Sequence, residues 1–240
     1  MRIIGKALYG SNNYHLDGPQ SDKDYKLFIA PEFIDLYNGK DKYGVPFGFT
    51  EKDNVSTIDF RKLDSLLRKG NVNTIEYLFS TELYIYDETF IPYFELARHV
   101  LKEGYIAYVW DYYFASAKGL VLNSIKRMND CEESRRKATS RGFWMINFIS
   151  YLINNNYRIT DSVWNNPIIY ENPCKIRYEE DAFTPITEDE WLEMFKYLEI
   201  MAANNPNTKP NYILQDYNNQ LMLCAQNIIA AAIKKELEAR

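Results

Sequence analysis

Two aspartates near the start of the chain have the residue type and the spacing to carry out metal chemistry. Asp22 and Asp24 stand two apart at the entrance to the apolar run DYKLFIA. On an extended strand, alternate side chains point to the same face, about 6.6 Å apart along the chain. Two carboxylates that converge in this way attract a cation, and their hard oxygen ligands favour Mg²⁺ or Mn²⁺. The pair therefore predicts a metal site, and one of its carboxylates has the chemistry to bridge two metal ions.

A glycine–serine pair, Gly10 and Ser11, precedes the aspartates by one polar turn. Gly10 permits close approach of the backbone, and Ser11 offers a hydroxyl beside N–H groups that a following helical turn would leave free. This combination is typical of a phosphate cradle. Gly18 and Pro19 would bring the cradle to the carboxylates, so the stretch predicts a site for a metal-bound nucleoside triphosphate. Taken singly, Gly-Ser is a turn and Asp-x-Asp is a cap or a solvated strand edge.

The elements that must position these residues change type along the chain. Residues 24–30 and 55–60 have strand patterns, whereas residues 2–9 fit a strand or the end of a helix. Residues 61–70 predict a helix that ends at Gly70, and residues 35–54 predict a long loop. The run 74–87 predicts a helix or strand that leads into the strand LYIY. Helical periodicity then dominates, and residues 156–186 fit no single element; the predicted helices are 95–129, 133–155, 187–204 and 210–239.

Composition places the chain among globular proteins. Its 240 residues are 46% apolar and 15% aromatic, enough for one large core or two modest ones. The sequence has no apolar run long enough for a membrane span and no signal peptide, so we expect a cytoplasmic protein without a membrane partner. A net charge of −5 disfavours the coating of nucleic acid through bulk charge. The cysteines predict neither a disulfide framework nor a zinc site; they are Cys131, Cys174 and Cys224.

The order of these motifs resembles the DNA polymerase β-type nucleotidyltransferase superfamily. Its signature is a Gly-Ser pair followed about ten residues later by Asp-x-Asp at the head of a strand, which stands here as Gly10-Ser11 and Asp22-Lys23-Asp24. The context YGSNNYHLDGPQSDKDYKLFIAP and the later phrase RKLDSLLRKGNVNTIEYLF are similar to a bacterial and phage group of predicted nucleotidyltransferases. The resemblance covers residues 4–80, and His15-Leu16 stands where the group tends to carry Gly-Leu.

The resemblance implies an α+β fold with two domains. Residues 1–94 would form a polymerase β-like catalytic domain, a mixed sheet with flanking helices, and residues 95–240 a helical domain. It also implies a third carboxylate on a neighbouring strand that contacts a metal and accepts the proton of the attacking hydroxyl. Asp59, in the strand VSTIDF, is our first choice, and Asp53 and Glu76 are the alternatives.

The basic residues of the helical half are the next candidates. Such charges usually form a solvated helix face. Lys137 and Arg141 stand four apart on one face, where they could meet a triphosphate tail or a nucleic-acid acceptor. In the resembling group a lysine and a histidine occupy a comparable helix. Lys137 is therefore a candidate nucleotide contact, whereas Thr139 or Ser140 stands in place of the histidine.

The resemblance implies metal-dependent transfer of a nucleoside monophosphate from an NTP, with ATP the expected nucleotide, to a hydroxyl, with release of pyrophosphate. The acceptor would be RNA, a protein side chain or a small molecule. One alternative is a nucleotide-sensing or antitoxin-like binding module without turnover. Another is a structural protein whose aspartates only solvate a turn. A calcium loop is excluded because Leu27 and Phe33 stand where glycine and glutamate are needed.

Overall fold

The structure is a computed structural model, and it describes residues 2–18, 21–38, 48–49, 53–126, 131–179, 181, 183–206 and 212–239. Residues 48–49, 53–54 and 212–213 are described by their backbone alone. These ranges contain one mixed β-sheet and a larger set of helices, with a helical region toward the C-terminus. The chain therefore has an α+β fold, as its sequence pattern predicts.

The described residues form one five-stranded sheet in the order β3-β4-β2-β1-β5. β1 pairs antiparallel with β2 and β5, whereas β2 and β4 run parallel. The strands predicted at 24–30 and 55–60 are confirmed, and residues 2–9 form a strand rather than a helix end. The register places Tyr9 beside Asp24, so the end of β1 meets the start of β2. The strand bounds are β1 Arg2–Tyr9, β2 Lys23–Ala30, β3 Gly48–Phe49, β4 Asp53–Asp59 and β5 Leu83–Ile85.

The helices begin at recognisable capping residues. Asp59 caps α2 by accepting a hydrogen bond from the Arg61 amide at 2.8 Å. Asn71 caps α3 in the same way through the Asn73 amide at 3.1 Å. The described α-helices are α1 Phe33–Tyr37, α2 Phe60–Leu67, α3 Val72–Leu78, α4 Ile91–Lys102, α5 Trp110–Lys126, α6 Glu132–Asn154, α7 Pro167–Tyr178, α8 Glu188–Ala203 and α9 Tyr212–Glu238. The short 3₁₀ helices are η1 Ser11–Tyr14, η2 Glu88–Phe90, η3 Tyr105–Ala107 and η4 Val163–Asn165.

Three predicted segments differ from the structure. The helix expected over 95–129 is interrupted at Gly104, whose φ of 90° lies in the left-handed region that ends a helix. The long loop expected over 35–54 overlaps the end of α1 and the start of β4, and its residues 39–47 and 50–52 lie outside the described part. The unassigned stretch 156–186 contains α7, which Asn166 caps and which holds Pro173 within it.

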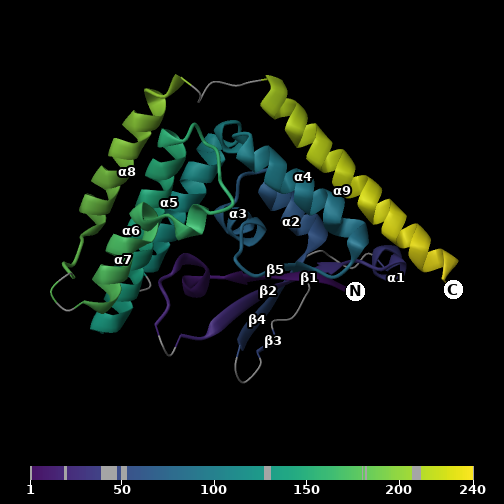
Figure 1. Cartoon of the computed structure of the whole chain (residues 1–240), viewed down its shortest axis with the longest axis horizontal. Helices are drawn as coiled ribbons and strands as arrows, with labels where there is room; N and C mark the ends of the chain where they lie inside the picture. The colour runs from purple at the N-terminus through teal and green to yellow at the C-terminus, as the bar shows by residue number, and fades with distance from the viewer. Residues whose placement is uncertain are drawn as a thin grey trace.

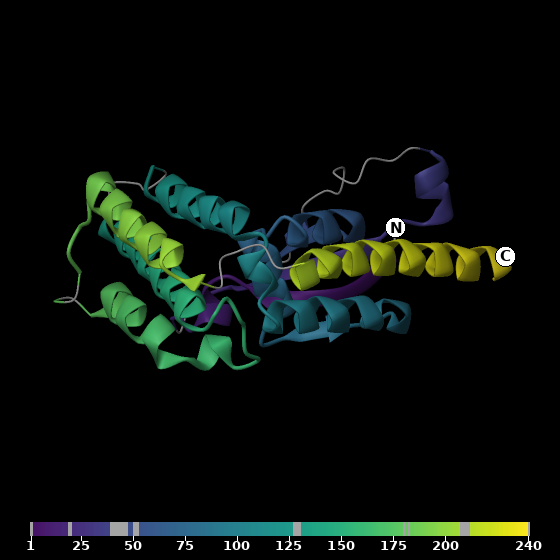
Figure 2. The ribbon, with the colours of Figure 1, turned by 90° about the horizontal axis from the view of Figure 1, so that it is seen from above.

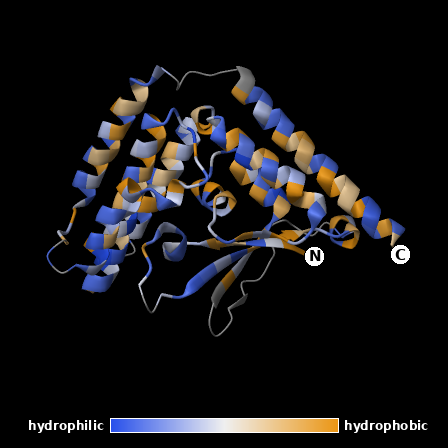
Figure 3. Ribbon diagram, in the orientation of Figure 1, coloured by the Kyte–Doolittle hydropathy of each residue, from blue (hydrophilic) through white to orange (hydrophobic). Residues whose placement is uncertain are grey.

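Most helices lie above the sheet in Figure 1, with α5 to α8 on one side of the molecule and α2, α4 and α9 on the other. Seen from above, α9 runs between α2 and α4 (Figure 2), and it packs against both. β1 is mostly apolar in Figure 3, whereas the helices alternate between apolar and hydrophilic turns. This alternation is typical of helices that bury one face.

One cluster of buried apolar side chains extends from Ile4 in β1 to Ala232 in α9. It includes residues of α5, α6 and α8 as well as those beneath α2 and α4. The division into domains at residue 94 stays a prediction, and it would separate α9 from α2, on which α9 packs. In the described ranges, no helix combines the length and the apolar character that crossing a bilayer requires.

Candidate functional site

Gly10 and Ser11 form a tight turn between β1 and η1. Gly10 has a φ of 78° and a ψ of −152°, a conformation that is essentially restricted to glycine. A Cβ atom on Gly10 would lie 3.1 Å from Oδ2 of Asp24. The turn therefore needs glycine both for its backbone angles and for the approach of the Asp24 carboxylate. The Asn13 side chain anchors the turn to the segment before β5, because its Oδ1 accepts a hydrogen bond from the Thr81 amide at 2.9 Å.

Asp22 and Asp24 line the same cleft as Ser11, a hollow of about 690 Å³. Asp24 is half-buried near the start of β2, whereas Asp22 is exposed and precedes the strand. The backbone at Asp22 is held to the cradle by Asn12, whose Nδ2 donates to the Asp22 carbonyl at 2.6 Å. The structure thus brings together the four residues that the sequence nominates as cradle and carboxylate pair.

Glu76 also lines the cleft, as does the exposed Glu133 of α6. Glu76 belongs to α3, and only 2% of its surface is exposed. Its Oε1 accepts a hydrogen bond from the Gly10 amide at 2.5 Å. Burial raises the pKa of Glu76 to about 7, against the opposing effects of hydrogen bonds from Tyr14 and Gly10 and of the positive charges of Arg141 and Lys26. Glu76 therefore ties α3 directly to the cradle.

The opposite wall of the cleft is cationic. Lys137 and Arg141 come from one face of α6, and Arg177 comes from the last turn of α7. Within the described residues, the three side chains form no ion pair. Arg177 only lies near the ring of Tyr178, with 5.6 Å between its guanidinium carbon and the ring centroid. Unpaired cations that face a shared hollow are suited to bind an anionic ligand.

Arg136, on the same helix, is by contrast a structural cation. Its Nε donates to Glu132 at 2.7 Å, and its Nη1 donates to the carbonyls of Ile176 and Glu179 at 3.2 and 2.8 Å. These bonds join α6 to the end of α7. Arg136 therefore holds the wall in place, whereas Lys137 and Arg141 remain available to a ligand.

Lys26 lies on the sheet side of the inner part of the cleft, which has a volume of about 390 Å³. It follows Asp24 by two residues on β2, so the two side chains share a face of the sheet. Its Nζ donates to Oγ of Ser56 and lies 5.0 Å from the centroid of the Tyr9 ring. Burial lowers the pKa of Lys26, while Glu76 and Asp24 act in the opposite direction.

Asp59 does not join this group, so the first choice for a third carboxylate does not fit the structure. In register, Asp59 pairs with Ile29 and Asp24 pairs with Asn54. Five residues of strand, about 16 Å, therefore separate Asp59 from the position beside Asp24. The Asp59 carboxylate is 1% exposed and accepts hydrogen bonds from Arg61 Nε and Nη2 at 3.0 and 2.7 Å. Its role is to cap α2 and to pair with Arg61.

The two alternatives for a third carboxylate are placed differently. Asp53 pairs in register with Lys23, and its side chain lies outside the described part of the molecule. Glu76 lines the cleft with Asp24, as described above. Within the described ranges, no group of three or more histidine, cysteine, aspartate or glutamate side chains is arranged to hold a metal.

The donor set nevertheless fits Mg²⁺. This ion typically keeps several waters and is held by one or two carboxylates together with the phosphates of a substrate. Asp22 and Asp24 supply two carboxylates at the mouth of a cleft whose other wall is cationic. Mg²⁺ or Mn²⁺ with a bound polyphosphate matches this arrangement, whereas a metal held by protein ligands alone does not.

Sequence reasoning missed Arg177 and Lys26. Lys26 carries a readable signal, since it continues the alternation of Asp22 and Asp24 on the same strand. Arg177 carries none, because it belongs to the stretch that fits no single element. His15, in contrast, lies away from the cleft: its Nε2 is 2.9 Å from Oδ1 of Asn165, and its ring contacts Tyr170.

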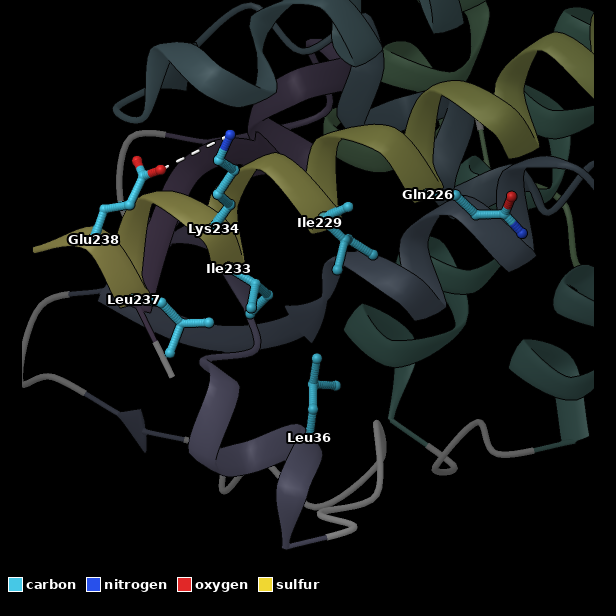
Figure 4. A pocket seen from close by; sticks show the side chains of 8 residues that line it. Leu36, Gln226, Ile229, Ile233, Lys234, Leu237 and Glu238 are labelled. Atoms are coloured by element: carbon cyan, nitrogen blue, oxygen red, sulfur yellow. Dashed lines mark ion pairs between the residues drawn. The ribbon is translucent and has the colours of Figure 1, made fainter. Parts of the chain in front are cut away.

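Another hollow, of about 690 Å³, lies along α9 (Figure 4). Ile229 and Ile233 point there toward Leu36 of α1, and the charges beside them form the pair Lys234–Glu238 at 3.8 Å. Apart from these charges and Gln226 its lining is apolar, and it lacks the converging polar groups that a small-molecule site uses for orientation. We therefore take the cleft at Asp22 and Asp24 as the candidate functional site. Comparison with known proteins returned no matching family model, no matching curated protein and no matching solved structure.

Proposed function

We propose that the protein is a metal-dependent nucleotidyltransferase of the DNA polymerase β type. It would transfer a nucleoside monophosphate from an NTP, with ATP the expected nucleotide, to a hydroxyl acceptor, and it would release pyrophosphate. The observation that carries the proposal is the pairing of two walls in one cleft. Asp22 and Asp24 form one wall, and the unpaired cations Lys137, Arg141 and Arg177 stand on the other.

The charges of the two walls suit the two ends of a triphosphate. Lys137, Arg141 and Arg177 can donate charge-assisted hydrogen bonds to the β- and γ-phosphates. Ser11 lines both parts of the cleft and Gly10 lines the inner part, so this turn would lie close to the phosphates of a bound nucleotide. Mg²⁺ at Asp22 and Asp24 would supply neutralisation of the charge that develops on the transferred phosphoryl group.

In the proposed reaction, the acceptor oxygen forms a bond to the α-phosphorus while the bond from that phosphorus to the bridging oxygen of pyrophosphate breaks. The hydroxyl proton is released to water. The chain contributes by positioning: the cations would hold the leaving pyrophosphate, and the two carboxylates would hold Mg²⁺ beside the α-phosphate. Glu76 supports the site through the Gly10 amide. RNA, a protein side chain and a small molecule are the acceptor classes to search.

The experiment is a thermal-shift titration with the four NTPs in Mg²⁺ and in Mn²⁺, followed by measurement of pyrophosphate release with candidate acceptors. We expect ATP with Mg²⁺ to raise the melting temperature of the wild type, because a ligand that binds only the folded state stabilises it. Asp24→Asn should abolish this rise. Asp17→Asn is the matched control, since Asp17 is an exposed carboxylate of the same loop that lines neither part of the cleft.

Two outcomes would count against the proposal. No response to any NTP in either metal would contradict nucleotide binding at this cleft. A nucleotide response without pyrophosphate release for any acceptor class would favour a binding module without turnover.

A further inference from the structure

This inference rests on the proposed function. We propose that the cleft uses a single metal ion, and that the ammonium group of Lys26 supplies the positive charge that a second metal provides in dinuclear phosphoryl-transfer sites. In such sites two metals about 3.5–4 Å apart stabilise both the attacking and the leaving oxygen. A lysine can take over one of these charges because its ammonium is a compact point charge with three donors.

The position of Lys26 carries the argument. Its side chain shares a strand face with Asp24 and lines the inner part of the cleft together with Glu76. Both carboxylates act electrostatically on the ammonium. The ammonium is anchored at Ser56 Oγ, and its Nζ lies 5.0 and 5.7 Å from the ring centroids of Tyr9 and Tyr77. An anchored cation thus lines the same part of the cleft as the two carboxylates and feels the charge of both.

The ligands for a second metal are correspondingly scarce. In β4, the parallel neighbour of β2, Asn54 lies in register with Asp24 and Ser56 lies in register with Lys26. Neither position carries a carboxylate, and the described residues contain no three-ligand group. A divalent cation that entered between Asp24 and Glu76 would also meet the Lys26 ammonium at close range, where like charges repel.

A purely structural role for Lys26 makes a different prediction. If its ammonium only neutralised the buried Glu76, the wild type would take up two metals with a nucleotide analogue, and Lys26→Gln would bind that analogue as tightly as the wild type does. The metal count of the wild type and the effect of Lys26→Gln on analogue affinity therefore separate the two roles, and both can be measured without turnover.

The test measures free Mn²⁺ by its electron paramagnetic resonance signal. The bound Mn²⁺ is the difference between the total and the free concentration. The intact protein is held with a non-cleavable ATP analogue whose α,β-bridge is methylene. We expect one Mn²⁺ per chain in the wild type. We expect two in Lys26→Asp, because this change replaces the cation with a carboxylate ligand. Lys26→Gln should keep one Mn²⁺ and bind the analogue about tenfold more weakly, since a charge-assisted contact is lost.

Lys23→Gln is the matched control, because Lys23 lies on the opposite face of the same strand and pairs with Glu82 at 2.7 Å. It should behave as the wild type in metal count and in analogue affinity. Two Mn²⁺ per wild-type chain would overturn the inference while leaving the proposed function intact. No binding of the analogue to the wild type would overturn the proposed function and the inference with it. If Lys26→Asp fails to fold, the wild-type count decides.

Discussion

At the scale of single residues, Gly10 meets two demands at the same position. Its amide donates to the buried Glu76, and its α-carbon lies beneath the Asp24 carboxylate. Any side chain at Gly10 would strain the backbone and push against Asp24. The cradle and the carboxylate pair are therefore coupled through one glycine.

Gly10→Ala should lower the free energy of unfolding by about 1–3 kcal/mol, the cost of placing a side chain in a conformation restricted to glycine. Urea denaturation measures the change. Gly119→Ala is the control, because a Cβ at this helical position would meet no atom within 4 Å beyond its chain neighbours and the helix's own backbone, and alanine is the better helix former. Equal effects of the two substitutions would contradict the strain at Gly10.

Glu76 makes stability depend on pH. Its pKa is raised to about 7 in the folded protein from 4.5, so the folded state favours the protonated form. Its stabilising contribution is complete below about pH 4.5 and is lost as the pH rises through 7. Relative to Glu76→Gln, the wild type should lose about 3 kcal/mol of unfolding free energy across this window.

Parallel urea titrations of the wild type and Glu76→Gln at several pH values measure this difference. Other carboxyl groups titrate in both proteins, so their effects cancel in the comparison. A pH-independent difference would show that Glu76 has an ordinary pKa in the folded state.

The residues of the site differ in how far sequence could predict them. Gly10, Ser11, Asp22 and Asp24 lie within one short stretch, so local spacing is enough to group them. Asp59 was misjudged because an aspartate at the end of a strand serves equally well as the cap of the following helix, and Arg61 takes up its carboxylate here. Residue type alone does not distinguish these two uses.

At the scale of elements, α7 contributes the least expected part of the site. Its Pro173 and the turns around it disguise the helical periodicity, so sequence could not place Arg177 on a helix. The strands at 24–30 and 55–60 were readable because their apolar patterns are regular. The interruption at Gly104 was not readable, because a single glycine is also tolerated within a helix.

Arg177, in the last turn of α7, should contribute to ligand binding through its positive charge. Arg177→Gln should weaken the binding of inorganic tripolyphosphate about tenfold, since a charge-assisted hydrogen bond contributes roughly 1.5–3 kcal/mol. Isothermal titration calorimetry measures the affinity. Lys175→Gln, at an exposed cation of the same helix that lines neither part of the cleft, should leave it unchanged. An equal loss in both variants would indicate a nonspecific effect of net charge.

At the scale of the whole molecule, the core links regions that are far apart in sequence. Leu221 of α9 is fully buried, and α9 packs on α2 and α4, whereas Trp144, Trp164 and Trp191 lie in the helical region around α6. The apolar cluster that joins them is continuous. The sequence predicted a helix over 210–239, but it could not show which helices this one meets.

Leu221→Ala should lower the free energy of unfolding by about 2–5 kcal/mol, the usual cost of truncating a buried leucine. The shift should be equal by tryptophan fluorescence and by far-ultraviolet circular dichroism, because one core couples α9 to the tryptophans. Leu223→Ala, at a side chain 53% exposed on the same helix, should change stability by less than about 0.5 kcal/mol. A shift seen by dichroism alone would indicate two regions that unfold separately.

The cleft has one further consequence, which concerns the synthesis of the chain. Tyr14 of η1 packs against Trp144, with ring centroids 3.8 Å apart, and Tyr178 donates to the carbonyl of Leu16 at 2.9 Å. At a translation rate of about 5–20 residues per second, these partners leave the ribosome on the order of ten seconds after the cradle. The nascent N-terminal region therefore makes these contacts only after α6 and α7 have been synthesised, and the cleft is complete only once most of the chain has emerged.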